Sequence, residues 1–321
     1  MPVTRREFLV SSVAAAAAGV IVPCPIARLH ARPQTPPAQQ PAPLNPVFTP
    51  VRRNVGIYTC RGGTIAHLIN AGGVVVVDSQ YPDAAKLCLD GLRERTGGRP
   101  VYVLINTHHH ADHTGGNVAF KPVTGQIVAH AKVPELQRIA NAQAATPAEQ
   151  AYATVTFDGA WNRAVGDETI KAAAFTPAHT GGDIVVHFEK ANVVHVGDLV
   201  FNRLQAYVDR TPGGASAVHW ITAVENILKT YPADAVYVFG HAAAKFQVTG
   251  TRADVVVMRD YLTALVAFVR AEIKAGKTRD QIVAIREVLK GFDDHGPLSA
   301  RALTGTYDEL AGTDLGALSM T

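Results

Sequence analysis

The sequence has little of several features that would place it in other classes of protein. Cysteine occurs only three times in 321 residues, too few for a structural zinc site closed by four thiolates. Two of the three, Cys60 and Cys88, lie beyond the first 31 residues, and the sequence leaves open whether they pair. Charge of one sign is not in excess, since the formal net charge is +3, and aromatic residues make up only 7%. We therefore expect a small-molecule substrate and no nucleic-acid partner.

Long apolar runs are also missing. The run near the start, residues 10–22, is shorter than the roughly 20 residues that span a bilayer. No later segment is both long enough and free of charge. We therefore expect no membrane contact once the N-terminal segment is removed.

The N-terminal segment has the organisation of an export signal. Arg5 and Arg6 precede the apolar run of small residues, and a cleavage point is expected after Ala31. This pattern predicts a twin-arginine signal peptide over residues 1–31, hence recognition by the twin-arginine export machinery and a periplasmic or secreted location. Retention as an N-terminal anchor is the alternative. Cleavage would remove three arginines and one glutamate, which lowers the net charge from +3 to +1.

Beyond the signal, a proline-rich segment precedes a region in which strands alternate with helices. Residues 32–50 hold few large apolar side chains, which predicts an extended linker. Asp83 is expected to cap the first helix, and a glycine pair to end it. Strands are expected at residues 56–60, 64–70, 74–78, 101–106, 168–175, 184–189, 192–196 and 235–239, and helices at 83–95, 215–230, 252–275 and 279–290.

One short motif carries most of the chemical information in the chain. His108, His110, Asp112 and His113 follow the apolar, β-rich run 101–106, which places them in a loop leaving a strand. In an extended segment side chains alternate between faces, so the first two histidines project to one side and the residue between them points away. The other two ligands come round to the same pocket at a glycine pair. Imidazole and carboxylate together suit zinc, with iron or manganese as substitutes.

Three further motifs supply single candidate ligands in the second half of the chain. They are centred on His179, Asp198 and His241, each beside a strand-like run. Taken alone, each has an ordinary interpretation, since histidines beside strands are usually structural and Gly-Asp is a common turn signal. Their joint occurrence with the first motif favours a metal site. The remaining histidines are expected to be structural: His30, His67, His109, His130, His187, His195, His219 and His295.

The H-x-H-x-D-H run and its three partners, in this order, resemble the metallo-β-lactamase-fold hydrolases over roughly residues 52–245. The resemblance implies a four-layer αββα sandwich, two mixed sheets packed face to face with helices outside, where periodicity alone gives only an α/β fold. It implies a catalytic domain over residues 51–245, with residues 246–321 as a helical extension of that domain. It also implies two zinc ions: one held by His108, His110 and His179, one held by Asp112, His113 and His241, and both bridged by Asp198.

The same resemblance implies a function. Two zinc ions would activate a shared water for attack on a carbonyl-centred bond of an ester, thioester, lactone or amide. Asp112 is expected to orient that water as well as to bind the second metal. True β-lactamases of the family generally carry cysteine or serine in place of Asp198, so a class B-like β-lactamase is the alternative. Iron-dependent persulfide oxidation and metal binding without turnover are further alternatives, because a fold does not fix a function.

Substrate contacts are expected from the loop at residues 202–216. Arg203 or Arg210 would pair with a substrate carboxylate, because guanidinium binds that group in a bidentate fork. Tyr207 would line the same pocket, and a plain connecting loop is the alternative. The apolar faces of the C-terminal helices would cover the core or a partner subunit, and the oligomeric state stays open.

Overall fold

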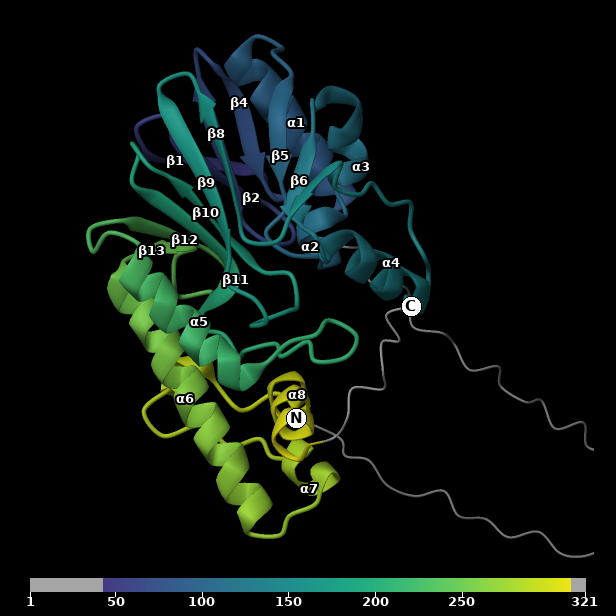
Figure 1. Cartoon of the computed structure of the whole chain (residues 1–321), viewed down its shortest axis with the longest axis vertical. Coiled ribbons are helices and arrows are strands. Elements are labelled where there is room, and N and C mark those ends of the chain that lie inside the picture. Colours follow the sequence, from purple (N-terminus) through teal and green to yellow (C-terminus); the bar gives the residue numbers. More distant parts are fainter. Residues whose placement is uncertain (1–42, 313–321) are drawn as a thin grey trace, which may run out of the picture. The chain divides into compact units, whose positions relative to one another are not determined.

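The computed structural model describes residues 43–312. The predicted signal peptide and residues 32–42 of the predicted linker lie outside the described residues. Two β-sheets face each other, and helices lie on the outer side of each (Figure 1). Within residues 43–312, no helix combines the length and the apolar character needed to cross a membrane.

The first sheet has seven strands in the order β1-β2-β3-β4-β5-β6-β7. Neighbours from β1 to β4 run antiparallel, and those from β4 to β7 run parallel. Parallel neighbours need a crossover, which α1 (Pro82–Thr96) supplies after β4 and α4 (Val133–Gln143) supplies after β6. The strands are β1 (Val47–Arg52), β2 (Val55–Thr59), β3 (Ile65–Asn70), β4 (Gly73–Val77), β5 (Val101–Ile105), β6 (Ile127–His130) and β7 (Val155–Phe157).

The second sheet has six strands in the order β13-β12-β11-β10-β9-β8. Only the β11–β12 pair is parallel within it, and α5 (Ala217–Thr230) makes that crossover. The strands are β8 (Ala160–Val165), β9 (Glu168–Ala174), β10 (Ile184–Phe188), β11 (Val193–Asn202), β12 (Val236–Ala242) and β13 (Thr249–Gly250).

The inner faces of the two sheets share one apolar interior. Val77 and Ile105 of the first sheet belong to the same buried cluster as Val186, Val193 and Val238 of the second. Successive side chains of a strand point to opposite faces, so the other face of each sheet needs its own cover. Both sheets therefore form the middle of the fold, with a helical layer on each side.

Helices supply that cover. On the first sheet, α1 buries Cys88 and Leu92 against the strands. On the second, α5 and α6 (Arg252–Lys274) bury Trp220, Leu262 and Leu265. The four-layer αββα arrangement expected from the resemblance is confirmed. Cys88 is buried and is not bonded to the other described cysteine.

The C-terminal extension packs on this same core. Its further helices are the short α7 (Arg279–Val283) and α8 (Ala300–Leu310). Near the end of α8, Glu309 accepts hydrogen bonds from the Ser216 hydroxyl at 2.5 Å and from the Ala217 N–H at 2.6 Å. A carboxylate at the first turn of α5 is favourable because the helix N-terminus exposes unpaired N–H groups and a positive dipole end. This contact fixes α8 against the second sheet's helical layer.

Several element boundaries differ from the sequence-based expectation. The strand β1 begins at Val47, inside the predicted linker, because its backbone pairs with β2. The cap of α1 is Tyr81, with proline at the first helical position and Asp83 in the first turn, a place that suits proline's fixed φ and missing N–H. The helix expected to reach residue 290 ends at Val283. Residues 285–290 do not continue the helix. The Glu287 carbonyl accepts a hydrogen bond from the Leu298 N–H instead of from the next helical turn.

Candidate metal centre

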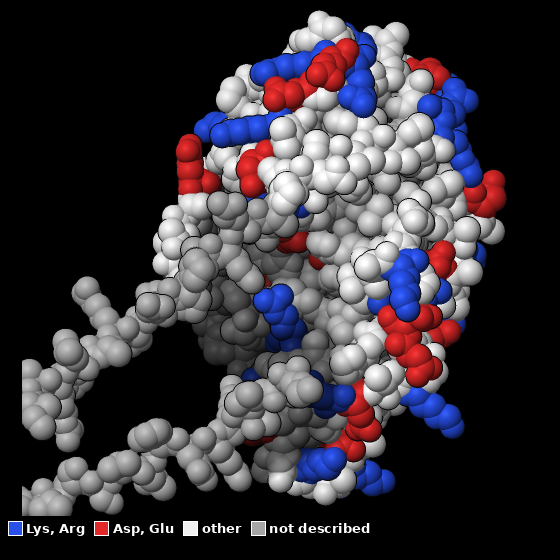
Figure 2. Space-filling view, turned by 180° about the vertical axis from the view of Figure 1, so that it is seen from behind, with Lys and Arg blue, Asp and Glu red and all other residues white. Residues whose placement is uncertain are grey.

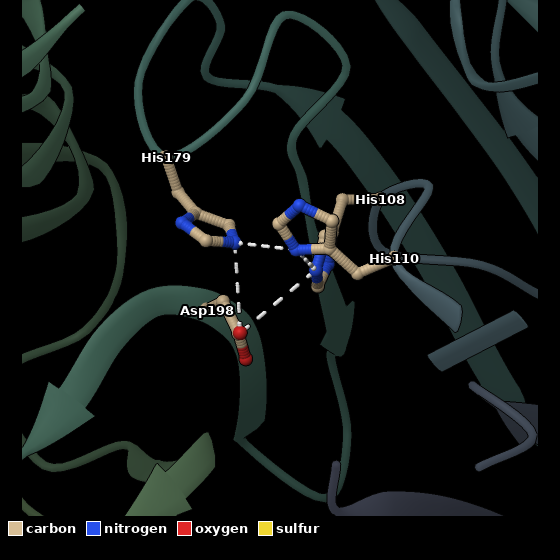
Figure 3. Close-up of side chains that lie close together, drawn as sticks. All are labelled: His108, His110, His179 and Asp198. Atoms are coloured by element: carbon tan, nitrogen blue, oxygen red, sulfur yellow. Dashed lines mark hydrogen bonds and ion pairs between the residues drawn. The ribbon is translucent and has the colours of Figure 1, made fainter. Parts of the chain in front are cut away.

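Three histidine rings converge in the space between the two sheets. His108 and His110 come from the loop after β5 of the first sheet, and His179 comes from the loop between β9 and β10 of the second. His108 Nε2 and His179 Nε2 each lie 3.0 Å from His110 Nδ1. Figure 3 shows these rings pointing toward one another, with the Asp198 carboxylate beside them. The structure thus brings together the first predicted ligand group.

The loop after β5 reaches this geometry through a bend. Residues 107–109 are not extended, so the strand-alternation argument was wrong about the backbone although the expected histidines do converge. Asp78 holds the bend, since its carboxylate accepts hydrogen bonds from the Thr107 N–H and the Thr107 hydroxyl, both at 2.8 Å. Sequence reasoning missed Asp78, whose signal is an acidic residue directly after the buried strand β4.

The second predicted ligand group also assembles. Asp112 and His113 lie on the short helix α2 (Ala111–Thr114), and His241 lies on β12. His241 Nε2 is 3.1 Å from Asp112 Oδ2 and 3.3 Å from His113 Nε2. One donor atom from each of the three lies within 4.8 Å of the others. This spacing is short enough for one ion to contact all three.

The carboxylate of Asp198 lies between the two groups. Its Oδ2 atom is 3.8 Å from His108 Nε2 and 3.6 Å from the Nε2 atoms of His179 and His241. Its Oδ1 atom is 3.1 Å from His113 Nε2. Asp198 is therefore the one described carboxylate that approaches histidines of both groups.

Local irregularity in β11 aims this side chain. Asp198 lies within the strand rather than in a turn after it, and the pairing of β11 with β12 shifts register on both sides of Gly197. Bulges of this kind redirect a side chain. The neighbouring strand must also come close, because a Cβ at Gly240 would lie 1.8 Å from Asp198 Oδ1. Glycine at 240 is thus required for Asp198 to occupy its position.

Hydrogen bonds on the outer side of the rings fix which nitrogens carry protons. His179 Nδ1 lies 2.7 Å from the Tyr207 carbonyl oxygen. A carbonyl only accepts, so Nδ1 carries the proton and Nε2 presents a lone pair when the ring is neutral. Two further rings are oriented by carboxylates: His110 Nε2 by Asp209 Oδ2 at 2.9 Å, and His113 Nδ1 by Asp78 Oδ2 at 2.7 Å.

Burial and charge act on the two groups differently. Burial lowers the pKa of His179 to about 3, so this ring is neutral at neutral pH. Burial also acts to lower the pKa of His113, but the carboxylates of Asp198 and Asp112 raise it well above its usual value. For Asp198, burial alone would raise the pKa, and the facing rings of His113 and His241 hold it well below its usual range. Positive charge is therefore stabilised where the second group meets Asp198.

The residues present fit two divalent cations. The lone pairs of His179 and His110 point at each other across 3.0 Å, a contact that repels unless a cation lies nearby. Imidazole nitrogens lie about 2.0–2.1 Å from zinc, so one ion can contact two ring nitrogens that are 3.0 Å apart. Asp198 Oδ1 is buried, with His113 Nε2 3.1 Å away, so this oxygen faces a ring nitrogen of the second group. Imidazoles and carboxylates without thiolates suit zinc, with iron or manganese as substitutes.

A cavity of about 580 Å³ opens over these ligands. The hollowed face in Figure 2 has acidic side chains in its depth and basic side chains near its margin. Tyr207 lines the cavity, as expected, but Arg203 and Arg210 do not. The Arg203 guanidinium lies 3.4 Å from Asp254 Oδ1, and that of Arg210 donates to the Ala215 carbonyl at 3.0 Å. Arg203 and Arg210, expected as substrate contacts, thus lie outside the lining of the metal cavity, and their contact with a substrate stays a prediction.

Several side chains at the centre were not singled out from the sequence. His109, expected to be structural, is buried with its Nε2 atom 3.3 Å from Asp209 Oδ2. The C-terminal extension contributes His295, Ser299 and Arg301 to the cavity wall. No motif marks these last residues, which lie after all the ligand-bearing segments and are brought to the cavity by the packing of residues 293–310.

Two facing mixed sheets, with imidazoles and carboxylates gathered where their loops meet, are typical of a class of metal-dependent αββα folds. The sequence profile described as "Metallo-beta-lactamase superfamily" matches residues 61–241. The match covers more than half of the sequence, and the chain belongs to this superfamily. The resemblance carried by the H-x-H-x-D-H run is thereby confirmed at the level of the family.

Curated relatives differ in their activities. The α subunit of 2,4-dinitroanisole O-demethylase from Nocardioides sp. (strain JS1661) is 28% identical over 47% of this chain and 45% of its own. Hydroxyacylglutathione hydrolase of Crocosphaera subtropica is 28% identical over 42% and 46%. The metallo-β-lactamase type 2 of Elizabethkingia meningoseptica is 27% identical over 54% and 67%. The chain spans about half the length of the first two.

A solved structure supports the fold. The metallo-β-lactamase from Pontibacter korlensis superposes with a TM-score of 0.57 at 20% identity, and the match covers 68% of this chain and 99% of that one. Identity this low shows a shared fold and carries no statement about substrate.

Removing the carboxylate of Asp209 should weaken metal binding. Asp209→Ala leaves His110 Nε2 without its partner and frees the ring to turn, so we expect zinc affinity to fall about 10–100-fold. Competition with a chromophoric chelator measures this. The matched control is Asp167→Ala, which removes a half-exposed carboxylate paired with Arg53. Equal zinc affinity in the two variants would contradict the orienting role of Asp209.

Proposed function

We propose that the chain is a dinuclear zinc hydrolase that cleaves a carbonyl-centred bond in an ester, thioester, lactone or amide. The observation that carries this proposal is the joint arrangement of two ligand groups with Asp198 between them, beneath a cavity of small-molecule size. Pockets for small ligands are usually about 300–1,000 Å³. The hydroxyacylglutathione hydrolase relative supports a hydrolytic activity.

Each ligand group has a defined part in this proposal. His108, His110 and His179 would hold one ion, and Asp112, His113 and His241 the other, with Asp198 shared. Bound divalent ions supply Lewis acidity, which lowers the pKa of water and polarises a carbonyl group. The outer hydrogen bonds orient the rings of His179, His110 and His113 so that their other ring nitrogens point inward.

Asp112 has a second part, because it also lines the cavity. Burial alone would raise its pKa, but His113 and a hydrogen bond with His241 lower it to about 2. At neutral pH the carboxylate is ionised and can only accept hydrogen bonds. We infer that it accepts a hydrogen bond from the attacking water and so orients that water toward the substrate.

Opening of β-lactams is the second candidate function. The observation in its favour is the similarity to the Elizabethkingia meningoseptica metallo-β-lactamase. Against it stands the aspartate at position 198, where the family's true β-lactamases generally have cysteine or serine. We therefore place esters, thioesters and lactones ahead of β-lactams.

A small substrate panel separates the two candidates. We expect the zinc-loaded protein to hydrolyse a phenyl thioester, a nitrophenyl ester or a γ-lactone, and to open a chromogenic cephalosporin at least about 100-fold less efficiently, a difference of roughly 2.7 kcal/mol in transition-state stabilisation. Absorbance assays of kcat/KM measure all four. A chelated sample is the control and should be inactive. Efficient cephalosporin opening would reverse the ranking, and turnover that survives chelation would refute the metal-dependent mechanism.

The variant Asp112→Ala should lose the second ion and most turnover. The side chain supplies one of three ligand atoms of the second group, so we expect bound zinc to fall from two ions toward one and kcat to fall at least about 100-fold. Elemental analysis and the assays above measure both quantities. Asp158→Ala, at a surface aspartate outside both ligand groups and the metal cavity, is the control. Two retained ions with full activity would contradict both roles of Asp112.

We also propose export by the twin-arginine route to the periplasm or beyond, with cleavage after the signal. Arg5, Arg6 and the following small apolar residues support this proposal. Replacing both arginines with lysine should keep the protein in the cytoplasmic fraction, as detected by immunoblot after cell fractionation. Undiminished export of the double variant would contradict the route.

A further inference from the structure

The C-terminal extension brings a cationic side chain to the metal cavity. Arg301 lies in the first turn of α8 and lines the cavity. Two arginines nearby are neutralised, since Arg203 pairs with Asp254 and Arg279 pairs with Asp308. Arg301 makes no ion pair with any residue of the 43–312 region, and it is exposed to solvent. Its charge is therefore available to a molecule in the cavity.

The position of this guanidinium is defined by an aromatic stack. Arg301 Cζ lies 5.0 Å from the centre of the Tyr207 ring, within the range of a cation–π contact. The Tyr207 ring stacks in turn on the ring of His110, with centroids 5.2 Å apart and planes at 18°. Arg301 and the candidate metal ligand His110 thus both contact the same aromatic ring.

Arg301 and Tyr207 also line a second cavity, of about 380 Å³. Arg210 lines this second cavity, and its Nε atom is buried with no hydrogen-bond partner among the described residues. The two cavities therefore share a wall that includes Tyr207 and Arg301. The candidate metal ligands line the first cavity, and Arg210 lines the second. Phe201 and Leu204 also line the first cavity and add apolar surface to it.

The wall is held in place by the extension's own contacts. The Gln205 side-chain amide donates to the carbonyls of His295 and Gly296, both at 3.0 Å, and its oxygen accepts from the Tyr261 hydroxyl at 2.7 Å. The Ser299 N–H also donates to the Gln205 oxygen at 3.3 Å, which holds the start of α8, while Glu309 holds its end against α5. A guanidinium on a fixed helix loses less freedom when it binds a partner.

We propose that Arg301 binds an anionic group at the end of the substrate remote from the bond that is cleaved, with Arg210 adding charge behind it. Guanidinium recognises a carboxylate through two parallel N–H donors. The substrate class is thus an ester, thioester or lactone that carries a free carboxylate at a distance from the reacting carbonyl. This inference rests on the proposed hydrolytic function and narrows its substrates.

A pair of matched esters tests the inference. The probes are the mono-4-nitrophenyl ester of glutaric acid, which keeps one free carboxylate, and its methyl-capped neutral counterpart. We expect Arg301→Gln to lower kcat/KM for the acidic probe about tenfold, chiefly through KM, because a charge-assisted bond is lost. The neutral probe should change by less than about twofold. Arg301→Lys should recover part of the loss, because it keeps the charge without the planar fork.

The control variant is Arg270→Gln, which removes an exposed arginine of α6 that lines neither cavity. It should treat both probes as the wild type does. Equal losses of Arg301→Gln on the two probes, or no loss on the acidic one, would overturn the inference.

A binding experiment keeps this result separate from the fate of the proposed function. Calorimetry measures the affinity of the zinc-loaded protein for glutarate, a dicarboxylate, and for butyrate, a monocarboxylate of similar length. Arg301→Gln should weaken glutarate binding about tenfold and leave butyrate unchanged. If the wild type hydrolyses neither ester, the proposed function fails, and the glutarate arm still decides the role of Arg301. Unchanged glutarate affinity in the variant would overturn it.

Discussion

The structure depends on a contact that is unfavourable by itself. The lone pairs of His110 and His179 face each other at 3.0 Å, and an ionised Asp198 is buried beside them. Electrostatic interactions are stronger where protein replaces water, so the groups that orient these side chains matter for the whole centre. The Tyr207 carbonyl and the carboxylate of Asp209 hold the rings from outside, and the bulged strand β11 holds Asp198. The fold thus concentrates ligand atoms in a small space, where a bound cation would be favoured.

Sequence reasoning selected side chains that the structure does bring together, because chain order and residue chemistry are enough to mark candidate ligands in a short motif. The strands around residues 101–106 and 192–196 were also predictable, since buried strands are marked by runs of β-branched residues. The backbone was less predictable: residues 107–109 bend, and Asp198 lies inside a strand whose register shifts. Such shifts depend on pairing with β12, an interaction between distant segments that a local pattern does not encode.

The residues of the cavity wall were even less predictable from local sequence patterns. Arg203 and Arg210 were expected at the metal cavity because they lie near the ligands in sequence, yet one is paired with Asp254 and the other lines the adjacent cavity. Arg301 lies 60 residues after the last ligand, His241. It reaches the cavity because α8 packs against α5, α6 and α7. Ligands are set by motif and strand order, whereas the substrate wall is set by tertiary contacts of a segment with no motif.

The origin of the ligands has a consequence for the sandwich as a whole. Each group combines residues of the first sheet with a residue of the second: His108 and His110 with His179, and Asp112 and His113 with His241. The sheets otherwise meet through apolar contacts, which are non-directional. Two bound ions would therefore cross-link the layers at their loop ends, and resistance to unfolding would rise with the logarithm of free metal concentration. The same ions that would act on a substrate would also keep the two halves of the protein from separating.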